Sequence, residues 1–170
     1  SVNEEINKHT GELIRTIKQK APKENGVNRM TWNLSEKGVF NLTRNEINRK
    51  REPNGVRVLP GEYKVRFTFG DQKDSTTLKV AFDPRVERSM SALQGQYEAA
   101  KNLEGNKSRA LVAVERIKES IMLVDDYAKK LKKKDEELYK EQIELGESTK
   151  DSLNVLLDIF VGEEDKRQGI

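Results

Sequence analysis

Cysteine is absent from the 170 residues, and histidine occurs once, at His9. Disulfides, thiolate zinc sites and cysteine nucleophiles are therefore excluded. One histidine also excludes a histidine metal cluster, and a Ser-His-Asp triad would have to use His9, which we interpret as an exposed turn residue. Asp125 and Asp126 lack the spacing of a calcium loop. We predict no catalytic, cofactor-binding or metal-binding residue, and no cofactor.

Long apolar runs are also missing, and none approaches the roughly 18 residues of a membrane span. The chain opens Ser1-Val2-Asn3, without Met and without a basic-then-apolar signal segment, so we expect a piece of a larger protein. The net charge of +3 is weak evidence for nucleic-acid binding. Residues 1–85 hold 17 Lys and Arg against 11 Asp and Glu (+6), whereas residues 86–170 hold 15 against 18 (−3).

Before Arg85, apolar residues recur at every second position, the period of a strand with one buried face. The clearest segments are 29–34, 63–69 and 78–82. The short polar segment 70–74 begins with Gly, so we expect the last two strands to be antiparallel neighbours in a hairpin. Weaker patterns predict strands at 5–8 and 13–17, joined by a turn at Thr10-Gly11.

The segment 35–59 lacks such a pattern, and we predict a long mobile loop with one short element around Phe40–Leu42. Pro60-Gly61 then makes a tight turn, because Pro presets the first turn dihedral and Gly accepts a positive φ. Trp32 could stack on a sugar ring, but its alternation with Met30 and Leu34 favours a place in the core.

After Pro84 the apolar spacing becomes helical. A first stripe runs from Val86 to Leu103, and Gly105 with Asn106 predicts the end of one helix and the start of the next. A second stripe, from Ala110 to Leu131, keeps a 4-3 spacing that requires a partner helix.

The turn to a third helix has two candidate positions. We place it near Lys133-Lys134-Asp135, with Asp135 as the cap and Glu136 and Glu137 in the first helical turn. Two helices of about 26 residues, each on the order of 39 Å long, then pair in an antiparallel hairpin. Gly146 lies inside the third helix at a cost of roughly 1 kcal/mol. A break at Gly146 avoids this cost but creates a helix of about 39 residues, too long for its neighbours to cover.

The basic run Lys129–Lys134 is the candidate for phosphate binding. Acidic residues flank it and no aromatic residue lies within it, so we interpret it as a solvated face and expect no nucleic-acid partner. The spacing of carboxylates along the sequence does not exclude an acid/base pair of the glycosidase type, because two carboxylates that are distant in sequence can converge in the fold. We interpret the following helix carboxylates as solvated faces: Glu115, Glu119, Glu136 and Glu144.

Three segments, 26–34, 58–65 and Asp83-Pro84-Arg85, resemble the C-terminal region of bacterial secreted sortilin-like, BNR-repeat proteins, often labelled glycosyl-hydrolase-like. The shared features are an Asn-Arg-x-x-Trp strand and a Pro-Gly-x-Tyr turn, and the resemblance spans nearly the whole chain. In that family a β-propeller precedes an immunoglobulin- or fibronectin-type-III-like domain and a helical segment. Asn33 stands where the family commonly has Asp.

Together, the periodicity of the apolar residues and the family resemblance predict an α+β protein of two domains. These are an immunoglobulin-like β-sandwich over residues 1–84 and an antiparallel three-helix bundle over residues 85–170. The resemblance implies a non-catalytic accessory or interaction module of a periplasmic or extracellular bacterial protein. Its expected partners are the propeller of the same protein and a protein or glycan. The alternative is a carbohydrate-binding module or part of a carbohydrate-active enzyme.

Overall fold

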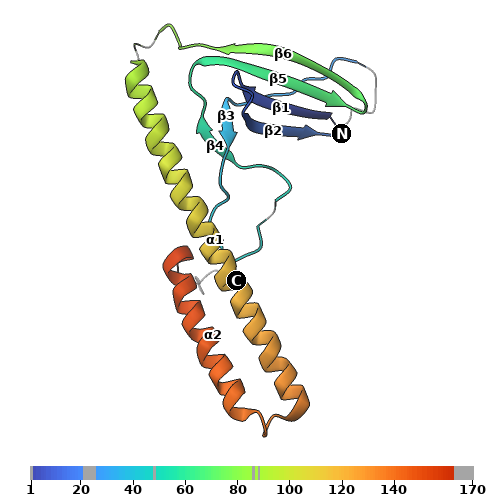
Figure 1. Ribbon diagram of the computed structural model, residues 1–170, viewed down its shortest axis with the longest axis vertical. Helices are drawn as coiled ribbons and strands as arrows, with labels where there is room; N and C mark the ends of the chain where they lie inside the picture. The colour runs from blue at the N-terminus through green and yellow to red at the C-terminus, as the bar shows by residue number, and fades with distance from the viewer. Residues whose placement is uncertain (1, 21–25, 48, 86, 88, 163–170) are drawn as a thin grey trace, which may run out of the picture. The chain divides into compact units, whose positions relative to one another are not determined.

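The computed structural model describes residues 2–20, 26–47, 49–85, 87 and 89–162 (Figure 1). These residues form an α+β protein with six strands, all paired antiparallel, and two helices. The chain divides into two compact units. Unit 1 comprises residues 1–39 and 48–105, and unit 2 comprises residues 40–47 and 106–170.

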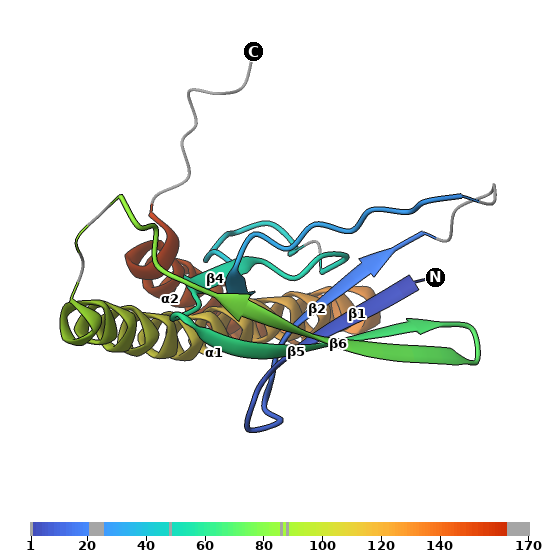
Figure 2. The same cartoon turned by 90° about the horizontal axis from the view of Figure 1, so that it is seen from above.

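Four strands of unit 1 form one twisted sheet in the order β2-β1-β5-β6 (Figures 1 and 2). Their bounds are β1 Val2–Lys8, β2 Leu13–Gln19, β5 Gly61–Phe69 and β6 Gln72–Val80. The strands predicted at 5–8, 13–17 and 63–69 are confirmed, as is the antiparallel pairing of β5 with β6. The turn between β1 and β2 uses Gly11 at a φ of 91°, a left-handed backbone that glycine adopts without a Cβ clash. Phe82 lies beyond the end of β6.

One face of this sheet carries the core of unit 1. Ile6 of β1 lies opposite Val65 of β5, and both are buried. Trp32 packs against this core with its ring 5.6 Å from that of Tyr63, at an interplanar angle of 67°. Its indole Nε1 donates to the carbonyl oxygen of Ser35 at 2.8 Å. The interpretation of Trp32 as a core residue is therefore confirmed.

The strand predicted at 29–34 is wrong. These residues have no ladder partner among those described, and Leu34 has a φ of 58°, in the left-handed region. An extended segment alternates its side chains just as a strand does, so Trp32 reaches the core without belonging to a sheet.

The loop predicted at 35–59 is confirmed only in its middle part. The described residues of 38–53 form no helix or strand, and no regular element forms at Phe40–Leu42, but the ends of the segment form two short paired strands, β3 Ser35–Lys37 and β4 Asn54–Arg57. Arg15 of β2 stabilises the pair, because its guanidinium donates to the carbonyl oxygens of Glu36 at 3.0 Å and Pro53 at 2.7 Å. The two sheets are compatible with a β-sandwich.

Two helices follow, α1 Met90–Asp135 and α2 Lys140–Val161. The predicted three-helix bundle is wrong because α1 continues through Gly105 and Asn106; Val86, in the first predicted stripe, lies outside the described residues. The turn predicted near Asp135 is confirmed, and its carboxylate accepts a hydrogen bond from the backbone N–H of Leu138 at 3.0 Å. Glu136 and Glu137 lie in this turn, ahead of α2.

In unit 2, residues 106–135 of α1 pack antiparallel against α2, and residues 40–47 lie along this hairpin. Lys107 donates to the side-chain oxygen of Asn41 at 2.7 Å, and Lys118 donates to the backbone oxygen of Asn45 at 2.9 Å. Arg44 forms an ion pair with Asp158 of α2. The two buried residues of α1, Leu111 and Val114, lie between the two lysines in sequence. A non-helical segment therefore packs along the helical hairpin of unit 2.

Candidate functional site

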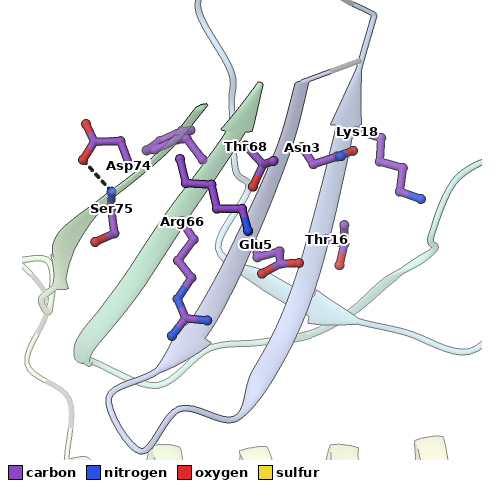
Figure 3. Close-up of a pocket in the computed structure, with 10 residues that line it drawn as sticks. Asn3, Glu5, Thr16, Lys18, Arg66, Thr68, Asp74 and Ser75 are labelled. Atoms are coloured by element: carbon purple, nitrogen blue, oxygen red, sulfur yellow. Dashed lines mark hydrogen bonds between the residues drawn. The ribbon is translucent and has the colours of Figure 1, made fainter. Parts of the chain in front are cut away.

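The solvent-facing side of the four-stranded sheet carries polar residues in two rows across the strands (Figure 3). One row is Lys18, Asn3, Thr68 and Lys73, and the other is Thr16, Glu5, Arg66 and Ser75. These residues line an open depression of about 860 Å³. Phe67 and Asp74 also line the depression, so its lining holds three cations and two carboxylates, and this small excess of positive charge suits an anionic, hydrogen-bonding ligand. Alternation in a half-buried antiparallel sheet also accounts for a polar outer face, so this face alone assigns no function.

The opposite face of the sheet holds a buried acid, Glu4, which is 7% exposed. One of its carboxylate oxygens has no hydrogen-bond partner among the described residues, and burial raises the pKa of Glu4. It lines a groove of about 380 Å³ together with Phe67, Lys20 and Arg29. Since two cations of the chain share this groove with Glu4, they would compete with a positively charged ligand for its carboxylate.

A second buried acid, Glu36 of β3, joins the start of α1 to the β3–β4 pair within unit 1. Its carboxylate accepts hydrogen bonds from the hydroxyl of Tyr97 at 2.5 Å and from Lys101 at 3.0 Å. Glu104 accepts from Lys101 at 3.2 Å and from the backbone N–H of Val56 at 3.0 Å. Burial, followed by the hydrogen bond to Glu36, raises the pKa of Tyr97 above its ordinary range. Desolvation lowers the pKa of Lys101, but its bonds to the two carboxylates outweigh this and raise it. The carboxylates of this cluster bond to Tyr97, to Lys101 and to the backbone of unit 1, which indicates a structural role.

The basic run Lys129–Lys134 ends α1, where four of its five lysines contact neighbouring carboxylates or aromatic rings. Lys129 pairs with Asp125 at 2.5 Å and Lys132 with Glu147 at 3.0 Å. Lys130 lies 5.5 Å from the ring centre of Tyr127. These contacts favour the interpretation of a solvated helix face.

The other candidate residues of the sequence analysis do not come together in one site. His9 is exposed in the turn after β1, and the carboxylates of Glu119, Glu136 and Glu144 lie on exposed positions of α1, the interhelical turn and α2. Within the described ranges, no group of three or more His, Cys, Asp and Glu is arranged to hold a metal ion.

Helix α2 has two apolar faces, of which α1 covers one. On the covered face, Ile143 and Leu157 are each 5% exposed, and the position of a Cβ on Gly146 lies 3.6 Å from Val124 of α1. On the other side of the helix, Leu145 is 69% exposed and Ile159 is 74% exposed. We call this second surface the outer face of α2 and define it by Leu145, Ser148, Thr149, Ser152, Val155, Leu156 and Ile159.

The residues that define the outer face carry no charge, and two of its three hydroxyls donate within the helix. Thr149 donates to the backbone oxygen of Leu145 at 2.7 Å, and Ser152 donates to that of Ser148 at 3.0 Å. Large exposed apolar side chains with no covering element mark interaction surfaces. The sequence held a signal for this face, since Leu145, Thr149, Ser152, Leu156 and Ile159 repeat with 4-3 spacing. The two hydroxyl residues in its centre hid the stripe from a search for apolar residues.

Comparisons with protein-family models, with curated proteins and with solved structures each found no match to this chain. In the part of α1 and α2 that the structure describes, no stretch is both long and apolar enough to cross a membrane. The chain is an α+β protein whose helical hairpin leaves the outer face of α2 open to solvent.

Proposed function

We propose that this chain is a non-catalytic interaction module and that the outer face of α2 is its contact surface. The observation that carries the proposal is the exposure of four large apolar side chains on one side of a single helix: Leu145, Val155, Leu156 and Ile159. A helix of an isolated hairpin normally presents charged residues to solvent on the side away from its partner. Instead, the seven residues that define the outer face include no charged side chain, and Lys150 on the covered side pairs with Asp125 of α1.

The resemblance to the C-terminal region of secreted sortilin-like, BNR-repeat proteins supports a wider context for this role. In that context the chain is an accessory module of a bacterial periplasmic or extracellular protein and lies beside a propeller of the same protein. The immunoglobulin-like character of the strands belongs to the same proposal, which the two-sheet arrangement and the core position of Trp32 support.

A second candidate function is binding of an acidic glycan on the polar sheet face. Lys18, Arg66 and Lys73 supply the cations, and Asn and Thr side chains of the same rows supply hydrogen bonds. Replacing these three cations with Gln should abolish retention on an acidic polysaccharide column if this candidate is correct. Equal retention of the variant and the unsubstituted chain would exclude it.

The contact-surface proposal is tested by replacing the four large outer residues with Gln. Because these side chains contribute little to the fold of the hairpin, the four substitutions together should change the free energy of unfolding by no more than about 2 kcal/mol at low micromolar concentration. The matched control is Ile143→Gln, on the covered face, which should unfold unit 2. Loss of the helical signal in the fourfold variant would show that the outer face belongs to the core of the chain and would end the proposal.

The non-catalytic part of the proposal is tested with the purified chain. It should unfold cooperatively and show no turnover of glycosides, esters or peptides. Turnover that persists through repurification would contradict it.

A further inference from the structure

We infer that the outer face of α2 pairs with the same face of a second copy of this chain, with the two α2 helices antiparallel. This inference rests on the proposed function and names the partner of that surface. It is carried by the spacing, the size pattern and the charge pattern of the face.

The spacing defines a seam. Leu145, Thr149, Ser152, Leu156 and Ile159 follow one another at intervals of 4, 3, 4 and 3 residues, which keeps them on one line along a packed helix pair. In the antiparallel alignment that centres the hydroxyl residues, Leu145 meets Leu156 of the second copy, and Thr149 meets Ser152 of the second copy. Each copy supplies both members of each layer, as an interface with twofold symmetry requires.

The size pattern of the four seam residues from Leu145 to Leu156 is symmetric under this alignment, and Ile159 lies opposite Gln142 of the second copy. Leucine layers lie on both sides of a centre made of small residues, where two helices can approach closely. The hydroxyls of Thr149 and Ser152 already donate to backbone oxygens at 2.7 and 3.0 Å. Covering them therefore leaves no donor without an acceptor.

The charge pattern is compatible with a second copy. The residues that flank the seam between Gln142 and Phe160 are neutral: Gly146, Ser148, Leu153 and Val155. Charged residues at such flanking positions usually select a different partner or exclude a self-pair. Here neither selection nor repulsion operates at the seam.

The same pattern favours the antiparallel alignment. Glu141 and Glu144 lie in the first turns of α2 and are exposed, whereas the acid that the structure describes near the other end of α2, Asp158, is paired with Arg44. A parallel pair would bring these four carboxylates together, whereas an antiparallel pair separates them along the helix. Antiparallel helix dipoles also attract one another.

The first experiment measures the oligomeric state of the 170-residue chain by sedimentation equilibrium. The seam is short, so we expect a monomer–dimer equilibrium with a dissociation constant on the order of 10 μM. Leu156→Asp should weaken the dimer by at least about 100-fold, because it places a charge in a leucine layer. The matched control is Leu123→Asp, at a residue of α1 that is 60% exposed and outside the seam, and it should leave the equilibrium unchanged. A chain that stays monomeric up to about 500 μM, or an equal loss in both variants, would overturn the inference.

The second experiment uses the absence of cysteine to test orientation and does not depend on the folding of the Asp variant. In the antiparallel pair, Leu145→Cys mixed with Leu156→Cys should form an intermolecular disulfide under mild oxidation. Leu145→Cys alone should not, because its own copy lies 11 residues, about 16 Å, along the helix. A parallel pair would give the disulfide with Leu145→Cys alone, and this result would overturn the alignment.

The two proposals fail in different ways. A folded chain that remains monomeric overturns the pairing and leaves the outer face exposed for another helix. An unfolded fourfold Gln variant overturns the contact surface itself.

Discussion

The buried acid Glu36 allows a quantitative test of how unit 1 is held together. Its side chain is 7% exposed and accepts hydrogen bonds from Tyr97 and Lys101 of α1. Glu36→Gln keeps the size of the side chain but removes the negative charge that both donors share. The substitution therefore tests the link between α1 and the β3–β4 pair without creating a cavity.

The expected magnitude follows from the exposure of the partners. A hydrogen bond to a charged group contributes about 1.5–3 kcal/mol, and removing one partner of a fully buried ion pair costs about 3–5 kcal/mol. The side chain of Lys101 is 39% exposed, so water screens its pair with Glu36. We expect Glu36→Gln to lower the free energy of unfolding of unit 1 by about 2 kcal/mol, and Tyr97→Phe by about 1.5 kcal/mol. The double variant should lose less than the sum, because both substitutions remove the same hydrogen bond.

Urea unfolding followed by tryptophan fluorescence measures these losses in unit 1. The only tryptophan, Trp32, donates to the backbone oxygen of Ser35, the residue before Glu36. A change below about 0.5 kcal/mol for Glu36→Gln would refute the reasoning, because that is the range of an ordinary surface substitution.

The same cluster predicts a loss of stability at high pH. The raised pKa of Tyr97 means that its neutral form is favoured in the folded chain. The stability that this contributes is complete below the unfolded pKa of about 10 and is lost as the pH rises above it. Tyr97→Phe should remove this loss.

Four further substitutions test local features. Gly146→Ala should stabilise unit 2 by up to about 1 kcal/mol, as measured by chemical unfolding. The added Cβ would lie 3.6 and 3.9 Å from α1 side chains, which are ordinary contact distances. No gain in stability would show that α2 must shift to accept the methyl group. Gly55→Ala should instead destabilise unit 1 by about 1–3 kcal/mol, since its Cβ would lie 2.7–2.9 Å from three atoms, and a neutral effect would contradict the packing of β4. Hydrogen bonds from Lys129 and Lys150 lower the pKa of Asp125 to about 2. In an acid titration of stability, the unsubstituted chain should therefore lose stability between pH 4 and 2 more steeply than Asp125→Asn. Identical profiles for the two chains would refute this. Glu4→Gln should raise stability by about 1 kcal/mol at pH 7 and not at pH 4, because an acid whose pKa burial raises destabilises the fold increasingly as the pH rises above its unfolded pKa. An equal effect at both pH values would contradict the burial of its charge.

The sequence predicted best those elements that a local period determines. Alternation located β1, β2 and β5, and a glycine turn located the β5–β6 hairpin. The turn near Asp135 came from matching helix lengths, and Gly146 is accepted inside α2 because it faces small side chains of α1. Gly105 looked like a helix end, but a glycine in a long helix costs only about 1 kcal/mol, and α1 continues through it.

The elements that the sequence did not predict depend on contacts between distant residues. β3 has three residues and no apolar period, and it is placed by Arg15, which lies 21 residues before Glu36. The outer face of α2 was missed for a different reason: its surplus of apolar residues becomes visible only once α1 is known to cover the other side. A period shows that a helix has an apolar face but does not show how many partners cover the helix.

The central claim is that the outer face of α2 contributes little to the fold of this chain, and two adjacent leucines test it directly. Leu157 is 5% exposed on the face that α1 covers, and Leu156 is 47% exposed on the outer face. By urea unfolding at low micromolar concentration, Leu157→Ala should cost about 2–5 kcal/mol and Leu156→Ala less than about 0.5 kcal/mol. Equal losses for the two variants would contradict the account.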